Sequence, residues 1–155
     1  MTSDIELKSE ICNCSALRQA ARHVTRFYDA FLFPIGLRTT QFSILAKLRE
    51  RGPLTITTLA AEMVMDRTTL GRNIRPLQRE GLVAVASGHR DHRSKQVRLT
   101  KTGLKQFGAA IGAWSEAQER FDAVFGAGRA AGLRNLLHIV SVTDLGRQCR
   151  GSKHG

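Results

Sequence analysis

The chain has 155 residues and a formal net charge of +11, a length that supports one hydrophobic core and therefore one domain. No apolar run approaches the roughly 20 residues that cross a bilayer, and the N-terminus lacks the basic start and apolar core of a signal peptide. These features predict a cytoplasmic protein whose three cysteines are thiols rather than structural disulfides.

The positive charge is concentrated in one part of the sequence. Residues 67–105 contain ten Lys and Arg against two Asp and Glu, a net charge of +8 out of the total of +11. A cluster of this kind is typical of proteins that bind nucleic acid, an anionic membrane or an acidic protein. The composition therefore predicts a negatively charged partner, but it does not distinguish among nucleic acid, an anionic membrane and an acidic protein.

Apolar residues at helical spacing predict the first two helices. Residues 13–34 form a long amphipathic helix that Asn13 or Ser15 can cap, and its apolar positions are Leu17, Ala20, Ala21, Val24, Phe27, Tyr28 and Phe31. Residues 39–52 form a second helix, which a threonine at its start can cap and Gly52 and Pro53 close. Its inward face consists of Phe42, Leu45 and Leu48.

A helix-turn-helix is predicted next. Residues 54–56 form a short strand, and residues 57–65 form a helix with Leu59, Ala60 and Met63 facing inward. The second helix of the motif covers residues 66–81, because Asp66 can cap it and Gly81 suits the position just past its end. One narrow face of that helix is apolar, with Leu70, Ile74 and Leu77.

The opposite face of this second helix is basic. Thr68, Arg72, Arg75 and Arg79 recur there at helical spacing, with a single carboxylate nearby to balance three guanidiniums. Such a face either binds an anionic partner or is simply solvated. Pro76 lacks the N–H that would bond to the Arg72 carbonyl, so we expect a bend or an early loosening there, with the base-reading residues before the proline.

Two short alternating runs predict an antiparallel hairpin. Residues 82–87 and 95–100 carry alternating apolar side chains, and residues 88–94 between them form a polar, basic loop that starts with glycine. A basic helix followed by a β-hairpin with a basic tip is the plan of a winged helix-turn-helix. The predicted fold class is therefore mostly α-helical with a small β-hairpin wing.

The C-terminal part predicts two more helices. The first carries a heptad-like seam at 3,4 spacing, interrupted by one glutamine: Leu104, Phe107, Ile111, Trp114, Gln118, Phe121 and Phe125. Gly126 to Gly128 break this helix, and residues 130 to about 145 form the last one. Together with the first helix, these helices carry more apolar surface than one protomer can use, which predicts that segments 12–34 and 101–147 form a dimer interface.

The wing carries a resemblance to a known family. Residues 91–100, DHRSKQVRLT, followed by Gly103, resemble the wing signature of MarR-type transcriptional regulators. The resemblance extends upstream through LTITTLAAEMVMDRTTLGRNIRPLQREGLV and covers most of the chain from the first helix to the last. It implies a single MarR-type domain over residues 1–155, in which residues 38–100 form the winged helix-turn-helix lobe.

The resemblance also implies a function. MarR-type proteins are homodimeric transcriptional regulators, often repressors released by a small molecule such as an aromatic acid or phenol, bound between the dimer helices and the DNA-binding lobe. The two-fold axis of such a dimer requires a pseudo-palindromic operator in double-stranded DNA, with half-sites about one helical turn, roughly 10 base pairs, apart. The sequence does not identify the ligand, because the family's pocket residues form no motif that can be matched.

Specific residues of the two elements are expected to contact DNA. A helix fits the major groove, where arginine can bond to guanine O6 and N7 and threonine suits phosphates or thymine methyls. By the motif match, Arg93 corresponds to the wing arginine that enters the minor groove in this family. Asp91 either orients it through a charge-assisted bond or only caps the turn. The predicted DNA-binding residues are Arg67, Thr68, Thr69, Arg72, Arg75, Arg90, Asp91, Arg93 and Lys95.

The cysteines provide an alternative interpretation. Cys12 and Cys14 lie at the start of the first helix, where a Cys-x-Cys pair can bind a soft metal or form redox adducts. Some MarR-type proteins sense oxidants through a cysteine near this end. The chain would then be a redox- or metal-responsive regulator; otherwise the thiols are spectators or packing residues.

The remaining candidate residues predict neither a metal site nor a catalytic site. His89 and His92 flank Asp91, but three ligands with no fourth do not complete a metal site. His23 and His138 are single helical histidines, which we expect to be buried and hydrogen bonded. No nucleophile, base and orienting residue occur together and no cofactor loop is present, so the sequence predicts neither an enzyme nor a cofactor.

Overall fold

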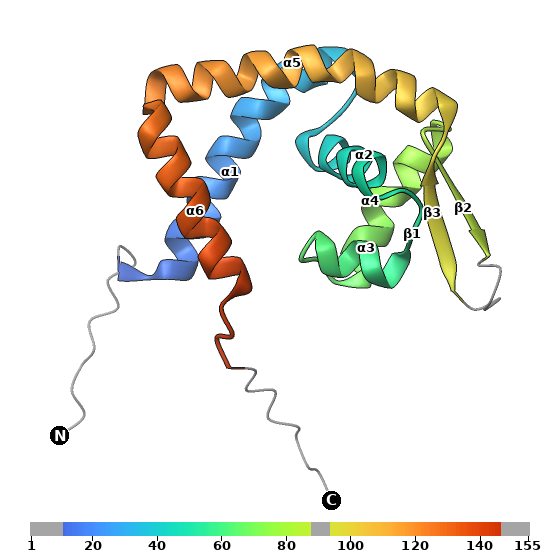
Figure 1. The fold of residues 1–155 in the computed structure, drawn as a ribbon, viewed down its shortest axis with the longest axis horizontal. Helices are drawn as coiled ribbons and strands as arrows, with labels where there is room; N and C mark the ends of the chain where they lie inside the picture. Colours follow the sequence, from blue (N-terminus) through green and yellow to red (C-terminus); the bar gives the residue numbers. More distant parts are fainter. Residues whose placement is uncertain (1–10, 88–93, 147–155) are drawn as a thin grey trace, which may run out of the picture. The chain divides into compact units, whose positions relative to one another are not determined.

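The computed structural model of the chain describes residues 11–87 and 94–146. They belong to two compact units, one up to Gln118 and one from Glu119, and the boundary falls within a long helix. The elements in Figure 1 are α1 Asn13–Leu32, the 3-10 helix η2 Phe33–Ile35, α2 Thr39–Arg51, β1 Leu54–Thr55, α3 Ile56–Glu62, α4 Arg67–Arg79, β2 Val83–Ser87, β3 Lys95–Leu99, α5 Lys101–Phe125 and α6 Ala127–Val142. The predicted fold class is confirmed: the protein is mostly helical with a small antiparallel sheet.

The sheet has three strands in the order β1-β3-β2. Val83 of β2 pairs with Leu99 of β3, and Val97 at the centre of β3 faces Val85 on one side and Leu54 on the other. Val83 and Val97 are almost completely buried, as the alternation predicted. Both the hairpin and the short third strand are therefore confirmed.

One hydrophobic core holds the helix-turn-helix to this sheet. Its fully buried side chains come from α2, α3, α4, β2 and β3, with Leu32 and Leu37 from the chain before α2. They include Ile44, Leu45, Leu59, Leu70, Leu77 and Val97. Burial of a leucine or isoleucine side chain contributes about 1.5–3 kcal/mol, so this core fixes which face of each helix remains in water.

Helix α4 continues through its proline. Gly81 adopts a φ of 72°, the left-handed conformation expected just past a helix end. The helix, however, extends three residues beyond Pro76, and the Glu80 N–H donates to the Pro76 carbonyl at 3.0 Å. The expectation of early loosening is wrong, because buried Ile74 and Leu77 hold the helix against the core on both sides of the proline.

Two helix caps differ from the sequence prediction. The Cys12 thiol, rather than Asn13 or Ser15, caps α1, and its Sγ accepts a hydrogen bond from the Ser15 N–H at 3.4 Å. Thr39 is the first residue of α2 and does not cap it. Instead, the Thr39 N–H and hydroxyl each donate to Asp29 Oδ1 of α1 at 2.7 Å, so a carboxylate from the preceding helix satisfies the start of α2.

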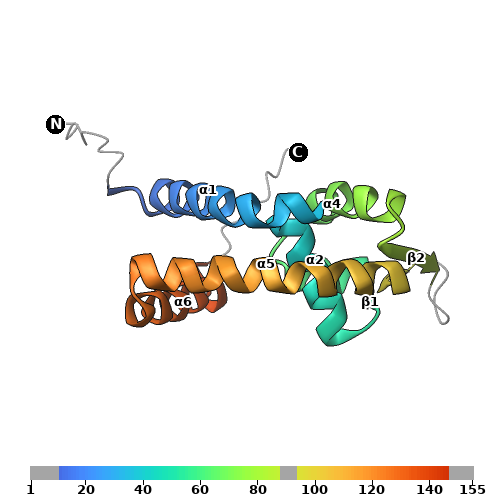
Figure 2. The same ribbon diagram turned by 90° about the horizontal axis from the view of Figure 1, so that it is seen from above.

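A close contact fixes where α5 begins. The Thr100 hydroxyl donates to the Gly81 carbonyl at 2.6 Å and accepts from the Gly103 N–H at 2.9 Å. A Cβ atom on Gly103 would lie 1.9 Å from the Leu82 carbonyl oxygen, so only glycine permits this approach. Farther along, the Tyr28 hydroxyl of α1 donates to Gln118 Oε1 of α5 at 2.5 Å, which joins the two helices where they pass each other (Figure 2).

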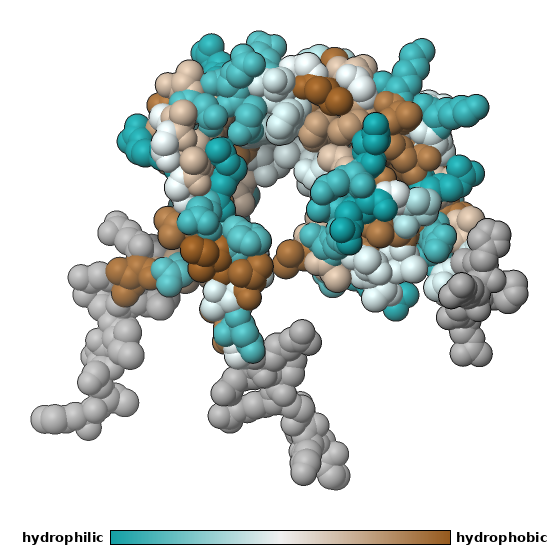
Figure 3. Space-filling view, viewed as in Figure 1, coloured by the Kyte–Doolittle hydropathy of each residue, from teal (hydrophilic) through white to brown (hydrophobic). Residues whose placement is uncertain are grey.

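The helices predicted for dimerisation expose apolar side chains. In the unit from Glu119 on, the second half of α6 exposes Leu136, Ile139, Val140 and Val142, and Figure 3 shows apolar side chains gathered near its end. On α5, Ile111 and Leu104 are each 45% exposed.

The expectation that the two helical histidines are buried is wrong, because His23 and His138 are exposed. No helix in residues 11–87 or 94–146 is both long enough and apolar enough to cross a membrane.

Candidate nucleic-acid interface

The exposed face of α4 carries most of the predicted contact residues. Burial of Leu70, Ile74 and Leu77 fixes the rotation of the helix about its axis. As a consequence, the side chains on the other face lie in water: Arg67, Thr68, Thr69, Arg72, Arg75 and Arg79. This separation of apolar and basic faces agrees with the sequence prediction, and it places three guanidiniums along one exposed stripe.

The start of α4 is held by one carboxylate. Asp66 Oδ1 accepts the Thr69 N–H at 2.7 Å, and Asp66 Oδ2 accepts the Thr69 hydroxyl at 2.7 Å. These bonds from the Thr69 backbone and then from its side chain hold the pKa of Asp66 below its usual value. The Thr69 hydroxyl is thus engaged in the cap, whereas Thr68, beside it, is exposed.

Three arginines of α4 border a surface groove of about 620 Å³. Its lining residues are Arg72, Arg75, Pro76, Gln78 and Arg79. Within the described residues, none of these guanidiniums lies in an ion pair with a carboxylate. The groove therefore presents uncompensated positive charge, which favours an anionic ligand.

The groove also includes a residue that the sequence analysis did not propose. Gln78 lines it, although it was assigned no role, and Arg79 lines it although we expected the functional residues to precede Pro76. The missed signal was the spacing: Gln78 and Arg79 follow Arg72 and Arg75 by three to seven residues on one helix. A glutamine amide is also a group that reads base edges.

Only part of the predicted wing lies in the described residues. Lys95 is exposed at the start of β3, opposite Ser87, and Arg98 is exposed on the same strand. Arg90, Asp91 and Arg93, with His89 and His92, lie outside the described residues. Their contacts with DNA, and the bond between Asp91 and Arg93, stay predictions.

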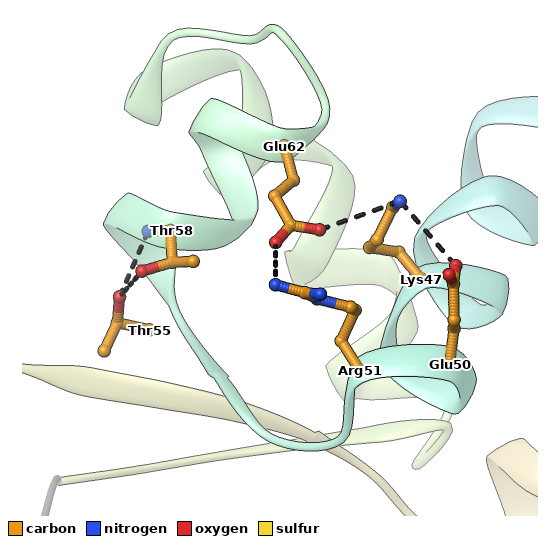
Figure 4. A network of polar contacts seen from close by, with 6 residues as sticks. All are labelled: Lys47, Glu50, Arg51, Thr55, Thr58 and Glu62. Carbon is orange, nitrogen blue, oxygen red and sulfur yellow. Dashed lines mark hydrogen bonds and ion pairs between the residues drawn. The ribbon is translucent and has the colours of Figure 1, made fainter.

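An ion-pair network joins α2 to α3, the first helix of the helix-turn-helix (Figure 4). Arg51 Nη2 lies 3.0 Å from Glu62 Oε1, and Lys47 Nζ lies 3.6 Å from Glu62 Oε2. At the start of α3, Thr55 Oγ1 accepts the Thr58 N–H at 3.1 Å. The ion pairs tie the last residue of α3 to α2, and the Thr55 hydroxyl caps the start of α3.

A second candidate site is an open cavity of about 500 Å³ in the same unit, between α1, α2 and α5. Its polar lining groups are hydroxyls, an amide and one ion pair, and its apolar lining is largely aromatic. The residues are Val24, Thr25, Tyr28, Thr39, Phe42, Ser43, Ala46, Lys47, Glu50, Met63, Trp114 and Gln118. The rings of Phe42 and Trp114 are stacked, with centroids 6.0 Å apart. A cavity with this lining suits a small aromatic molecule.

The cysteines at the start of α1 are accessible. Cys12 and Cys14 are both exposed free thiols. In the described part of the chain, no three His, Cys, Asp or Glu residues are grouped as metal ligands would be. Cys149, the third cysteine, lies outside the described residues.

A helix-turn-helix with a basic second helix, followed by a β-hairpin that forms a three-stranded antiparallel sheet with the preceding strand β1, defines the winged helix-turn-helix class. A model of the MarR family matches residues 37–95. The transcriptional regulator MosR of M. tuberculosis, solved in complex with DNA, is 37% identical over 81% of this chain and 92% of that chain, with a TM-score of 0.71. A second MosR structure is 33% identical over 88% of this chain and all of that one, with a TM-score of 0.73. The chain therefore belongs to the MarR family.

Curated relatives agree with this assignment. An uncharacterized HTH-type transcriptional regulator of Bacillus subtilis is 33% identical over 91 residues, and the match covers 59% of this chain and 66% of that protein. The organic hydroperoxide resistance transcriptional regulator of the same organism is 26% identical over 97 residues, which cover 63% of this chain and 66% of that protein. These relatives are transcriptional regulators, so the chain belongs to that class of protein and is not an enzyme.

Proposed function

We propose that the protein is a homodimeric transcriptional regulator that binds a pseudo-palindromic operator in double-stranded DNA. One observation carries this proposal: the groove on α4 presents Arg72, Arg75 and Arg79 without carboxylate partners among the described residues, on a helix whose opposite face is locked in the core. The DNA complex of MosR, the 37% identical relative, supports the same partner.

Each α4 helix lies in a major groove, and each wing lies in the flanking minor groove. Arg72 and Arg75 bond to base edges, and Thr68 contacts phosphate or a thymine methyl. The full set of contact residues is Arg67, Thr68, Thr69, Arg72, Arg75, Arg90, Asp91, Arg93 and Lys95. Thr69 contributes chiefly through the Asp66 cap, because its hydroxyl is already bonded there.

The dimer forms through the terminal helices, segments 12–34 and 101–147, and the winged lobe covers residues 38–100. The exposed apolar side chains of α6 and the exposed seam residues of α5 support this assignment, since a second copy would remove them from water. The protein functions in the cytoplasm, where its operator is.

The regulator is a repressor that a small aromatic ligand releases from DNA. The open cavity between α1, α2 and α5 is the proposed ligand site, because Tyr28, Phe42 and Trp114 give it an aromatic lining. Met63, which follows α3, also lines the cavity, so a ligand there would touch the helix-turn-helix directly.

Salt dependence tests the proposed DNA binding. If the basic cluster contacts phosphates, log K falls linearly with log salt, and about six contacts per dimer give a slope of about −5. The duplex is one that the protein selects from a random library, and affinity is measured by fluorescence anisotropy from low to high salt. A flat salt response would overturn the proposal.

A second candidate function is a response to oxidants through Cys12 and Cys14. Both thiols are exposed, and the similarity to the organic hydroperoxide resistance regulator of Bacillus subtilis supports this alternative. Hydrogen peroxide would convert an exposed thiol to a sulfenic acid with release of water. Operator binding by the wild type and by a Cys12→Ser/Cys14→Ser variant is compared with and without mild peroxide or Cu(I). An identical response of both proteins would make the cysteines spectators.

A further inference from the structure

The turn that joins α3 to α4 in Figure 1 contains a residue with a strained backbone. Val64 has a φ of 52°, and in residues 11–87 and 94–146 it is the only residue other than glycine with a positive φ. In this left-handed conformation, the Cβ atom of an L-residue lies too close to the following carbonyl oxygen. A β-branched side chain is an outlier there, so valine is among the least suitable residues for this position.

Two other helix ends show which residue this position ordinarily holds. At the end of α3, the N–H groups of Val64 and Met65 donate to carbonyls three and five residues earlier, at 3.1 and 2.9 Å. This pair of bonds is the Schellman motif, in which glycine usually takes the left-handed position. The same pair occurs around Gly81 after α4 and around Gly36 after η2. The chain therefore places glycine in two of these motifs and valine in the third.

Packing within the chain does not account for this valine. Its side chain is 77% exposed, whereas Met63 and Met65 on either side pack against the core. Val64 is also not among the residues that line the cavity between α1, α2 and α5, although Met63 is. Strained residues that the surrounding structure holds in place occur preferentially where a protein contacts a ligand or partner. The strain at Val64 therefore indicates a contact outside its own chain.

Val64 belongs to the surface that leads into α4. It precedes the capping residue Asp66 by two positions, so their Cα atoms are at most about 7 Å apart. Arg67 and Thr68, both exposed, follow Asp66 directly. In a helix-turn-helix, residues at the start of the second helix contact base edges in the major groove. The exposed methyl groups of Val64 are thus continuous with the surface that we propose for DNA binding.

We propose that Val64 is a further specificity residue, whose methyl groups contact the C5-methyl group of a thymine at the edge of each half-site. This inference rests on the proposed operator binding. A valine side chain has no donor for a phosphate, and the Asp66 carboxylate beside it repels one. The thymine methyl is the apolar group that the major groove presents. Because a valine side chain has little rotamer freedom and the turn is already fixed, the contact costs little conformational entropy.

Deoxyuridine tests the contact, because it pairs as thymidine does but lacks the C5-methyl group. Each thymine of an operator that the wild type selects is replaced in turn, and affinity is measured by fluorescence anisotropy. For the wild type, we expect one thymine in each half-site whose replacement lowers affinity about three- to tenfold, the effect of one buried methyl group. Val64→Gly should bind the unmodified operator more weakly by the same factor and should be insensitive to that replacement. Thr68→Ala is the matched control on the same surface, and it should keep the sensitivity at that thymine.

The same substitution should have the opposite effect on stability. Val64→Gly removes the strain and should raise the midpoint of thermal unfolding by about 2–4 °C. Val64→Ala keeps a Cβ atom and should gain less, while it loses the sensitivity to deoxyuridine as Val64→Gly does. Gly81→Val makes the reciprocal change in the same motif and should lower the midpoint. A residue with only a structural role would not lower DNA affinity in a variant that is more stable than the wild type.

The outcomes separate this inference from the proposed function. If the wild type binds no duplex in a salt-dependent way, the proposed function fails and the thymine contact fails with it. If the wild type binds DNA but shares its deoxyuridine profile with Val64→Gly, the contact is overturned while DNA binding stands. A Val64→Gly variant that is no more stable than the wild type would overturn the strain on which the inference is built.

Discussion

At the start of α4, a single carboxylate positions the residues that face the groove. Asp66 accepts two hydrogen bonds from Thr69, and the helix that follows places Arg72 and Arg75 in water about one and two turns farther on. This arrangement was predictable, because a cap and its partner lie three residues apart. The cap of α2 was not, because its acceptor, Asp29, lies ten residues earlier in another helix.

The clearest prediction for one residue concerns base reading by Arg72. Arg72→Ala should cost about 1–3 kcal/mol per half-site and relax sequence preference, as loss of a bidentate base contact does. Arg93→Ala should weaken binding with little change in major-groove preference, except where a narrow A·T minor groove is favoured. Competition among operator variants measures both effects. If Arg72→Ala weakens all sequences equally, Arg72 contacts phosphate instead.

The Asp66 cap makes stability depend on pH. Because its pKa is lower in the folded chain than the ordinary value of 3.8, the ionised cap stabilises α4 fully above about pH 4. That contribution is lost as the pH falls through the lowered value. Asp66→Asn keeps a capping side chain that does not titrate. Thermal unfolding should show a stability advantage of the wild type at pH 7 that shrinks below pH 4, and a gap independent of pH would contradict this account.

At the scale of elements, the junction between the wing and α5 determines how the winged lobe continues into the long helix. The sequence pointed to Gly103 as part of a family signature but offered no physical reason for it. The structure supplies one: the first turn of α5 passes against the Leu82 carbonyl, and the Thr100 hydroxyl bridges both segments. Contacts of this kind join residues about 20 positions apart, so periodicity alone does not reveal them.

Gly103→Ala should therefore destabilise the protein by roughly 1–3 kcal/mol, because the new Cβ meets backbone that must shift. Gly108→Ala is the matched control on the same helix, since nothing lies within 4 Å of the position that its Cβ would occupy. It should be neutral or stabilise by up to about 1 kcal/mol, through better helix propensity. Chemical denaturation measures the free energy of unfolding of both variants. Equal effects of the two substitutions would contradict the special role of Gly103.

For the whole molecule, periodicity predicted helices α1 to α6, because the patterns of the core-forming helices are local, but it did not predict the 3-10 helix η2. Helix α6 begins at Ala127, inside the glycine segment that we expected to break the helix, rather than at residue 130. One chain alone does not account for the apolar faces of α5 and α6 that remain in water. Leu136 and Val142 are 62% and 67% exposed although their helix is largely apolar. The sequence predicts this surplus of apolar surface, and the proposed second copy of the chain would remove it from water. The contacts of the wing arginines are likewise not predictable from a single chain, because their proposed partner is DNA.

The assembly itself is testable through the seam on α5. Phe121 packs against Phe125 with ring centroids 5.3 Å apart, and Phe121→Asp would place a charge in this apolar contact, a penalty of several kcal/mol. Ala123→Asp is the matched control, because it adds the same carboxylate at an exposed position off the seam. Sedimentation equilibrium should show dimers for the wild type and for Ala123→Asp, and monomer or aggregate for Phe121→Asp. A wild-type monomer at micromolar concentration would refute the dimer. It would also refute the paired half-site geometry, because two half-sites about 10 base pairs apart require two α4 helices related by a two-fold axis.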